Sequence, residues 1–272
     1  MSPTQLSRNH MSQQRQAGAA IIVTGAAGGI GGGITRRLMA DGWRVVATDL
    51  NADSLAALRS DGDDRLVTMT LDVARADGVG KVAAKLGADG IAVAGLVNAA
   101  GLLQDVASFM AIDETAQRRI WDVNYFGAVT CTQVFAPMMA AAGGGAIVNI
   151  TSINELRPLP LHAYAPTKVA LGALTTLTAG ELGRAGIRVN AIAPGFTLTP
   201  ILRDKIASGK RDIGAIEKAT AMGRLVEIDE IASVASFLMS DDASAVTGAS
   251  IPVDAGWLTT SHWMNFGDLL GV

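Results

Sequence analysis

Short apolar segments alternate with helical patterns along nearly the whole 272-residue chain, and this alternation restricts the fold more than any other feature. Each segment is about four to eight residues long and almost entirely apolar, which is typical of strands that are buried on both faces. Alternating strands and helices predict a parallel sheet with right-handed crossovers and helices on both sides. The segments are Ala19–Val23, Arg44–Thr48, Leu66–Leu71, Val93–Val97, Ala146–Ile150, Ile187–Ala193 and Ala249–Val253.

We expect one folded domain over residues 19–272, because no shift in composition divides the chain. Helical periodicity over Gly29–Ala40 and near Ala52–Arg59 fits such a domain. Residues 1–18 are polar and contain arginine but no acid. They lack an apolar core, so we predict a flexible leader rather than a secretory signal, although the composition is also compatible with a transit peptide.

The composition excludes several classes of protein. A hydrophobic share of 49% and a charged share of 17% predict a large buried core. A net charge of -3 and the lack of a basic run argue against nucleic-acid binding. No apolar stretch reaches the roughly 18 residues of a membrane span, and we expect a cytoplasmic protein without a membrane partner. The single cysteine, Cys131, is expected to be a small buried hydrophobe, and the three histidines have no metal-ligand spacing, so we predict no metal site.

A glycine-rich turn, Thr24-Gly-Ala-Ala-Gly-Gly-Ile-Gly31, follows the first apolar segment. Glycines between a strand and a helix let backbone N–H groups approach a pyrophosphate, and the helix N-terminus adds the positive end of its dipole. Asp49 ends the second segment, where a carboxylate can bind the ribose hydroxyls of NAD and repel the 2′-phosphate of NADP. With no Arg or Lys in the turn or directly after Asp49, the pattern predicts NAD; the alternative is a structural turn with a solvated aspartate. Gly32 and Gly33 continue into the helix, at a cost of up to about 1 kcal/mol each, and are expected to permit close helix–sheet packing.

Tyr164 and Lys168 lie four residues apart, shortly after Ser152. In a helix this spacing places two side chains on one face. A nearby positive charge favours the phenolate and lowers the tyrosine pKa from its ordinary value of about 10. The pair could therefore serve as a general acid/base for alcohol or carbonyl chemistry, although many helices carry Tyr and Lys at this spacing without such a role.

These motifs, in this order, resemble those of the short-chain dehydrogenase/reductase family over about residues 19–256. The resemblance implies a doubly wound Rossmann fold with a seven-stranded parallel sheet in one domain, commonly assembled as a homotetramer. It implies a catalytic tetrad of Asn124, Ser152, Tyr164 and Lys168. The cofactor positions that it implies, besides Tyr164 and Lys168, are Gly25, Gly29, Ile30, Gly31, Asp49, Leu50, Asp72, Val73, Asn98, Ala99, Gly101, Pro194, Gly195, Thr197 and Thr199.

The same resemblance assigns a role to each tetrad residue. Tyr164 would remove the substrate hydroxyl proton, and Lys168 would lower the tyrosine pKa and bind the nicotinamide ribose. Ser152 would fix the reacting oxygen. Asn124 would hold a water between Lys168 and solvent; the alternative is a buried amide that ties helix to sheet. Asp72 and Val73 would contact adenine, with a helix cap as the alternative for Asp72.

Three segments are expected to line the substrate site: the stretch after Ser152, a lid over residues 200–222, and the C-terminal tail. Asn154, Glu155 and His162 could bind a polar hydroxylated substrate, or could point to solvent or to each other. The charges of the lid fit a solvated face better than an anion clamp. The aromatic residues of the tail, Trp257, Trp263 and Phe266, fit a core or a subunit interface better than substrate recognition.

The leading interpretation is an NAD-dependent dehydrogenase that acts on a secondary alcohol, with a small polar molecule as its partner. The alternative enzyme is a carbonyl reductase of the 3-oxoacyl type that uses the same residues with NADPH. A third hypothesis is a non-catalytic nucleotide-sensing or scaffold protein, which would be expected to lack part of the tetrad.

Overall fold

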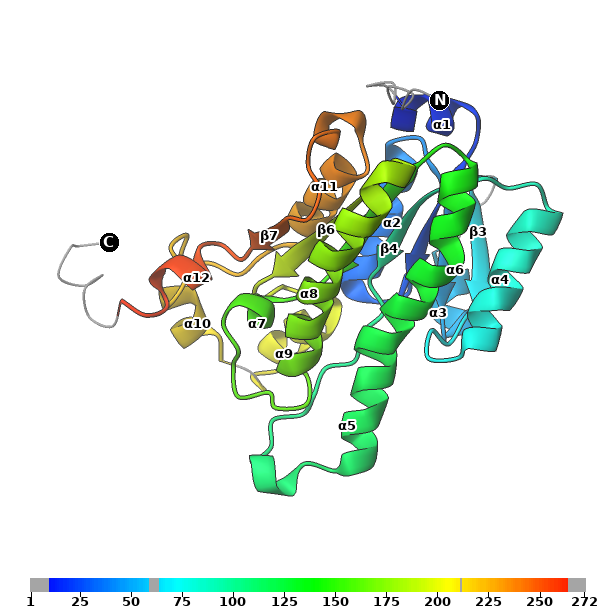
Figure 1. Ribbon diagram of the computed structural model, residues 1–272. Coiled ribbons are helices and arrows are strands. Elements are labelled where there is room, and N and C mark those ends of the chain that lie inside the picture. The colour runs from blue at the N-terminus through cyan, green and yellow to red at the C-terminus, as the bar shows by residue number, and fades with distance from the viewer. Residues whose placement is uncertain (1–9, 59–63, 211, 264–272) are drawn as a thin grey trace.

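The structure is a computed structural model that describes residues 10–58, 64–210 and 212–263. Its sheet contains seven parallel strands in the order β3-β2-β1-β4-β5-β6-β7 (Figure 1). This is the doubly wound arrangement expected from the sequence, in which the strand order reverses between β1 and β4. The strands are β1 (Ala20–Thr24), β2 (Arg44–Asp49), β3 (Leu66–Thr70), β4 (Val93–Asn98), β5 (Gly145–Ile150), β6 (Ile187–Pro194) and β7 (Ser250–Val253).

Alternate residues of the central strands feed two separate cores. Ile21 and Val23 pack into one core, whereas Ala20 and Ile22 pack into the other. This follows from the pleat, since successive side chains of a strand point to opposite faces. The edge strands β3 and β7 differ from the prediction, because most of their residues are only half-buried. An edge strand has one neighbouring strand, and the helices cover it less completely.

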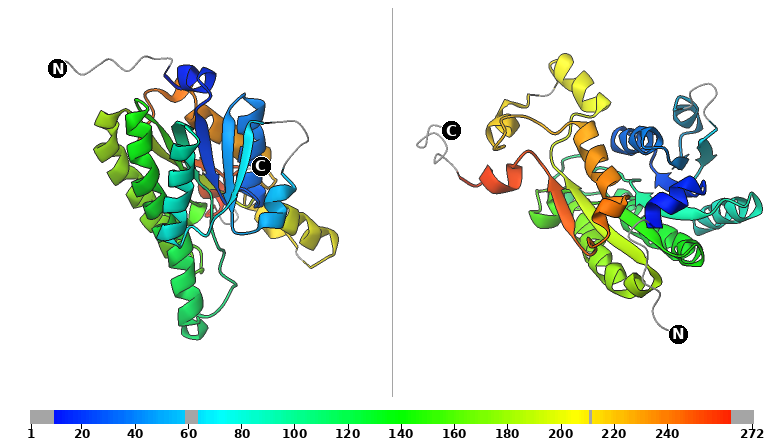
Figure 2. Two further views of the ribbon diagram at one scale, coloured as in Figure 1. Left: turned by 90° about the vertical axis from the view of Figure 1, so that its right-hand side faces the viewer. Right: turned by 90° about the horizontal axis from the view of Figure 1, so that it is seen from above.

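Two groups of helices cover the two faces of the sheet. Figure 2 shows one group on each side when the molecule is seen from above. The first group consists of α2 (Gly29–Ala40) and α11 (Ile228–Leu238). The second consists of α4 (Ala76–Ala88), α6 (Gly127–Ala141) and α8 (Ala165–Leu182). Cys131 is fully buried in α6, as predicted, and burial raises the pKa of its thiol to about 12.

Gly32 and Gly33, inside α2, have close neighbours of different kinds. A Cβ on Gly33 would lie 2.1 Å from Cγ2 of Ile228 in α11, and a Cβ on Gly32 would lie 3.1 Å from the carbonyl oxygen of Ala26. The sequence had predicted close packing between helix and sheet at these glycines. The close contact at Gly33 is instead between two helices.

The N-terminal segment departs from the expectation of a flexible leader. Residues His10–Gln16 form helix α1. The side chain of Met11 is buried, and the backbone N–H groups of Met11 and Ser12 each donate to the carboxylate of Asp241 at 2.9 Å. An acid accepting bonds from the first turn of a helix stabilises that helix, and this partner is distant in the sequence. Residues 1–9 lie outside the described part.

Several shorter elements lie at the carboxyl ends of the strands. Helix α5 continues through a π-helical turn into α6, and α5 with the loop before it projects away from the sheet (Figure 1). Helix α3 ends at Ala56, earlier than predicted. The remaining elements are α3 (Ala52–Ala56), η1 (Phe109–Ala111), α5 (Glu114–Trp121), η2 (Asp122–Phe126), α7 (Ile153–Leu156), η3 (Gly183–Ala185), α9 (Pro200–Ala207), α10 (Gly214–Lys218), η4 (Asp241–Ala243) and α12 (Trp257–Thr260).

Within the described residues, no helix combines the length and the apolar character needed to cross a bilayer.

Candidate active site

The glycine turn after β1 requires glycine at two of its positions. Gly25 has a φ of +65°, and a Cβ there would lie 2.7 Å from the backbone of Ala100. A Cβ on Gly31 would lie 2.1 Å from the carbonyl oxygen of Gly25. The turn is therefore folded tightly on itself and on the loop after β4, which explains the spacing of these glycines in the sequence.

The N-terminus of α2 is available to an anion. Its first residues include Ile30, and its N-cap, Gly28, supplies no side-chain acceptor to the free N–H groups of the first turn. A Cβ on Gly29 would lie 3.3 Å from the side chains of Thr199 and Pro200, so the turn faces the segment after β6. Uncapped N–H groups beside glycines suit a pyrophosphate, and these residues fit a dinucleotide cofactor.

Asp49 ends β2 beside the glycine turn. One carboxylate oxygen accepts the N–H of Ala27 at 3.0 Å, and the other accepts the N–H of Asn51 at 3.0 Å. The side chain of the next residue, Leu50, is largely exposed. The carboxylate is thus held at the position where a ribose would lie in a Rossmann-type site.

The loop after β4 is tied to β1 through a hydroxyl group. Thr24 Oγ1 accepts the N–H groups of Ala99 at 3.1 Å and of Ala100 at 3.2 Å. Asn98 is buried and donates to Oδ1 of Asn149 at 2.9 Å. Next in the loop, a Cβ on Gly101 would lie 3.6 Å from Oδ1 of Asn124 and 3.7 Å from Nζ of Lys168, so this glycine leaves space between two of the tetrad residues.

Asp72 connects the end of β3 to α5. Its carboxylate accepts the N–H of Ala74 at 3.0 Å and pairs with the guanidinium of Arg119 at 3.0 Å. Asp72 does not cap α4, because the N-cap of that helix is Arg75. Val73 is buried against Gly127.

The segment after β6 is fixed by packing and by local hydrogen bonds. Pro194 ends β6, and a Cβ on Gly195 would lie 2.7 Å from Cα of Asp254. Thr197 donates to the carbonyl oxygen of Gly195 at 3.0 Å. Thr199 caps α9 by accepting the N–H of Leu202 at 3.3 Å. The segment expected to close over nicotinamide therefore also starts the first helix of the expected lid.

Ser152, Tyr164 and Lys168 come together at the carboxyl end of β5. Ser152 caps α7, and Tyr164 is the N-cap residue of α8. The hydroxyl group of Ser152 lies near that of Tyr164 and acts to lower the pKa of the tyrosine. Nζ of Lys168 lies 5.5 Å from the centroid of the Tyr164 ring and donates to the carbonyl oxygen of Ile150 at 2.8 Å.

Burial controls the protonation of this cluster. Desolvation raises the pKa of Tyr164 to about 12, and the hydrogen bond with Ser152 opposes the shift. Desolvation also lowers the pKa of Lys168 to about 8, and the carboxylate of Glu155 opposes that shift. The Tyr–Lys spacing had predicted a lowered pKa for Tyr164. In the protein alone this pKa is raised instead, because desolvation outweighs the effect of a neighbouring ammonium group.

Asn124 lies in the π-helical turn between α5 and α6. Such turns occur frequently at functional sites. Its Oδ1 accepts the N–H of Leu102 at 2.7 Å, and its Nδ2 donates to the carbonyl oxygen of Leu102 at 3.0 Å and to Oγ1 of Thr167 at 3.2 Å. These bonds tie the loop after β4 to α8, so the side chain serves as a buried link, and the water-holding role stays a prediction.

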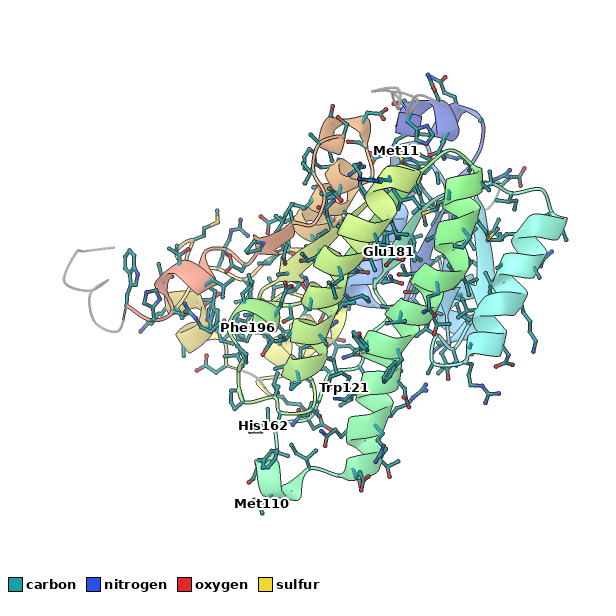
Figure 3. The ribbon with its side chains drawn as sticks, in the orientation of Figure 1. Met11, Met110, Trp121, His162, Glu181 and Phe196 are labelled. Atoms are coloured by element: carbon teal, nitrogen blue, oxygen red, sulfur yellow. The ribbon has the colours of Figure 1, made fainter. Side chains whose placement is uncertain are left out.

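Two of the three residues expected to bind a polar substrate are engaged within the protein. Asn154 donates to Ser152 Oγ at 3.1 Å and accepts the N–H of Leu159 at 2.9 Å. Glu155 accepts from Ser250 Oγ at 2.9 Å. His162 is exposed and stands edge-on to Phe109, with 5.4 Å between ring centroids. His162 and Met110 both lie at the end of the molecule where α5 projects (Figure 3).

Within the part of the C-terminal tail that the structure describes, one aromatic side chain is buried. Trp257 is buried edge-on to Phe196, with 5.8 Å between ring centroids. The guanidinium of Arg157 lies 5.9 Å from the Trp257 ring centroid and donates to Ser261 Oγ at 2.8 Å. Trp257 therefore packs in a core, as predicted, while Phe266 lies outside the described residues.

Sequence reasoning missed Gln104. Its side chain is buried, and its Oε1 accepts the N–H groups of Ala163 at 2.6 Å and of Tyr164 at 3.2 Å. A glutamine in a loop carries no pattern that points to a partner about sixty residues later, so no sequence signal could have identified it.

Comparisons with known proteins agree with this geometry. A family profile described as enoyl-(acyl carrier protein) reductase matches residues 25–258. The chain is 36% identical to D-threitol dehydrogenase of Mycolicibacterium smegmatis, with 89% of this chain and 94% of that protein covered. It is also 36% identical to galactitol 2-dehydrogenase (L-tagatose-forming) of Cereibacter sphaeroides, with 89% and 96% covered.

Two further similarities concern dehydrogenase/reductase proteins without a stated substrate. A solved structure of a short-chain type dehydrogenase/reductase from Mycobacterium ulcerans is 31% identical, with a TM-score of 0.83 and coverage of 89% of this chain and 90% of that one. An uncharacterized short-chain type dehydrogenase/reductase, y4vI of Sinorhizobium fredii, is 35% identical over 92% of this chain, and the chain spans 45% of its length.

Proposed function

The chain belongs to the short-chain dehydrogenase/reductase family of NAD(P)-dependent oxidoreductases that act on hydroxyl or carbonyl substrates, and on this premise we propose that it is an NAD-dependent dehydrogenase of secondary alcohols. We further propose that its substrate is a polar, hydroxylated small molecule. Asp49 supports the first part of the proposal, and the relatives that act on threitol and galactitol support the second.

The choice of NAD depends on the fixed carboxylate of Asp49. Two backbone N–H groups hold this carboxylate beside the glycine turn. In that position it can accept hydrogen bonds from two ribose hydroxyls, and it repels a 2′-phosphate through like charge.

The tetrad residues divide the work on the substrate oxygen. The bound oxidised nicotinamide supplies the hydride acceptor. Tyr164, as the phenolate, takes the proton of the substrate hydroxyl, while the carbinol hydrogen leaves with its electron pair and a carbonyl forms. Ser152, whose hydroxyl group lies near that of Tyr164, donates to the same substrate oxygen and orients it.

Lys168 favours the phenolate form of Tyr164. Its ammonium group lies 5.5 Å from the ring centroid in a site sheltered from water, where a positive charge acts more strongly than in solution. The positive charge of the oxidised cofactor acts in the same direction. Together these charges oppose the desolvation that raises the Tyr164 pKa to about 12 in the protein alone.

Initial rates of NADH formation test the proposal. Purified protein is assayed with NAD and, in parallel, with NADP against secondary alcohols, polyols, sugars and hydroxy acids. We expect turnover with NAD and faster rates with polyols than with simple aliphatic alcohols. Turnover with NADP alone would overturn the assignment of Asp49, and a preference for aliphatic alcohols would overturn the polar substrate.

A second candidate is an NADPH-dependent carbonyl reductase of the 3-oxoacyl type. Two observations favour it. The matching family profile is described as a reductase. In addition, the guanidinium of Arg36 extends back along α2, and a Cβ placed on Gly32 would lie 3.5 Å from it. An arginine near the glycine turn could bind a 2′-phosphate. The parallel assay with NADP distinguishes the two candidates.

We also propose that the protein is cytoplasmic and forms a homotetramer. Each subunit would have one domain over residues 19–272, against which α1 packs, and residues 200–222 would form the lid of its substrate site. Exposed apolar side chains on α8, Val169 and Leu177, support an assembled form, because a subunit contact would remove them from water. Size-exclusion chromatography with light scattering measures the mass, and a monomer would contradict the tetramer.

A further inference from the structure

Gln104 holds the backbone on which the proposed acid/base stands. Its side chain is only 8% exposed, in the loop that follows β4. Its Oε1 accepts the N–H of Ala163 at 2.6 Å and the N–H of Tyr164 at 3.2 Å. These N–H groups precede the first turn of α8, where a helix offers no acceptor of its own. Gln104 therefore supplies from another segment the acceptor for the N–H of Ala163, and a second acceptor for the N–H of Tyr164, which also donates to the carbonyl oxygen of Leu161 at 3.0 Å.

The orientation of the Gln104 amide is fixed by these two bonds. Two backbone donors require the oxygen on their side, so the Nε2 group must face the other way. There, among the described residues, Nε2 is buried without a hydrogen-bond partner. A buried unsatisfied amide costs about 1–3 kcal/mol. An apolar side chain would avoid this cost, so packing alone does not account for a glutamine at this position.

The same loop also holds a second member of the tetrad. Two residues before Gln104, the backbone of Leu102 exchanges two hydrogen bonds with the side chain of Asn124. Asn124 in turn donates to Thr167, next to Lys168. The loop thus links the π-helical turn with the start of α8, and the positions of Tyr164 and Asn124 depend on one short segment.

We propose that Gln104 is a positioning residue for the reaction, which acts by fixing the backbone of Tyr164 relative to Ser152 and Asn124. This inference rests on the proposed role of Tyr164 as the acid/base. Misplacement of a reacting group by about 1 Å can reduce turnover about 100-fold, and a loop that carries two tetrad contacts is placed to prevent such a shift.

Two variants of Gln104 and one control test this role. Gln104→Met keeps the length of the side chain and removes the acceptor, whereas Gln104→Glu keeps the acceptor and adds a charge. Gln133→Met makes the first change at an exposed position of α6 and serves as the control. For Gln104→Met we expect kcat to fall about 10–100-fold while the Kd for NAD stays within about twofold. For Gln104→Glu, measured at a pH where its carboxyl group is ionised, we expect part of this loss to be recovered, because the acceptor is restored while the added charge disfavours the phenolate of Tyr164.

A spectroscopic readout tests the same inference without turnover. The chain has two tyrosines, so Tyr125→Phe leaves Tyr164 as the single tyrosinate signal in ultraviolet absorbance. Among the described residues, the ionisable groups recorded as acting on this cluster are Lys168 on α8 and Glu155 on α7. In the Tyr125→Phe background, Gln104→Glu places a negative charge near the backbone of Tyr164 and should lower the tyrosinate absorbance at a fixed alkaline pH, which corresponds to a titration at higher pH, because a like charge disfavours the phenolate. Gln104→Met should not move it in that direction.

Each outcome bears on one of the two proposals. Unchanged kcat in Gln104→Met, or an equal loss of NAD affinity, would overturn the positioning role. An unchanged tyrosine titration in Gln104→Glu would overturn it as well, even if no substrate is turned over. Retained turnover in Tyr164→Phe, with the Gln104→Glu titration shifted as expected, would instead overturn the proposed function and leave the Gln104 contact intact.

Discussion

The cofactor side and the substrate side of the sheet's carboxyl edge are shaped by different kinds of contact. On the cofactor side, backbone atoms pack against glycines, and a Cβ on Gly25 or Gly31 would lie within 2.7 Å of the main chain. On the substrate side, the loop before α5 and the expected lid expose large apolar side chains, including Leu103 at 71%, Met110 at 89% and Ile201 at 69%. Close backbone packing therefore restricts the cofactor side to one conformation. The substrate side instead exposes apolar surface that a substrate or another subunit could cover.

The largest effect is expected at the junction of the two sides, in Tyr164→Phe. General acid/base catalysis contributes about 10²–10⁴-fold, and we expect a loss of turnover of this size with the affinity for NAD unchanged. Initial rates and NAD titration by fluorescence measure the two quantities. Tyr125→Phe, which removes the other tyrosine, should keep its activity. An equal loss of turnover in Tyr164→Phe and Tyr125→Phe would mean that Tyr164 is not the acid/base and that the reaction does not take place at the junction of the two sides.

The cofactor side should respond strongly to Asp49→Ser. Hydrogen bonds to charged groups contribute about 1.5–3 kcal/mol, so kcat/KM for NAD should fall about 10–100-fold while the value for NADP rises. Asp53→Ser, an exposed change in the nearby α3, should leave both values within about twofold. If the ratio of the two cofactors does not change in Asp49→Ser, the carboxylate does not select between them.

Close packing on the cofactor side should make it sensitive to a single methyl group. In Gly33→Ala the new Cβ would lie 2.1 Å from Ile228, and overpacking costs about 1–3 kcal/mol, measured by urea unfolding. The matched change Gly80→Ala adds a methyl group on the exposed side of α4, where nothing lies within 4 Å. That variant should be about 0.5–1 kcal/mol more stable than the wild type. A similar change in both variants would show that α2 and α11 can move apart freely.

A smaller effect is expected for stability in Lys168→Met. Burial disfavours the ammonium form and lowers the pKa of Lys168 to about 8, below its ordinary value of 10.5. At pH 7 the ammonium is charged in both states and destabilises the fold. Removing it should raise Tm by about 2–4 °C, or about 1 kcal/mol, since loss of the bond to Ile150 offsets part of the gain.

The pH dependence of this variant is the sharper test. Between pH 8 and 10.5 the unfolded wild type binds more protons than the folded form, so wild-type stability from this group rises with pH. The advantage of Lys168→Met should therefore shrink as the pH increases through this range. Thermal melts at several pH values measure it, and an advantage that grows with pH would contradict the buried ammonium.

The parts of the fold that depend on local pattern were predictable from the sequence. The apolar segment Ala19–Val23 corresponds to β1 at Ala20–Thr24, and the predicted helix Gly29–Ala40 is α2 with the same bounds. Strand and helix periodicity are properties of neighbouring residues, so one sequence contains them. The motifs also placed Ser152, Tyr164 and Lys168 at one end of the sheet, because the carboxyl ends of parallel strands share one edge.

The features that could not be predicted from the sequence depend on contacts between residues that are distant along the chain. Gln104 receives its N–H donors from residues about sixty positions later, and no local pattern indicates this. The predicted direction of the Tyr164 pKa shift was also wrong for the protein alone. Desolvation depends on all the segments that surround the side chain, and the Tyr–Lys spacing does not contain this information. The engagement of Asn154 and Glu155 within the protein likewise required the packed structure.

Helix α1 has a consequence for how the chain matures during synthesis. Its bonds from Met11 and Ser12 reach Asp241, 230 and 229 residues further on. Helix α1 can form contacts with Ala142 and Gly144 earlier in synthesis, but it lacks the carboxylate of Asp241 until that residue has been added. A seven-residue helix is too short to persist alone in water, so α1 becomes stable only after the distant segments that it contacts have been synthesised.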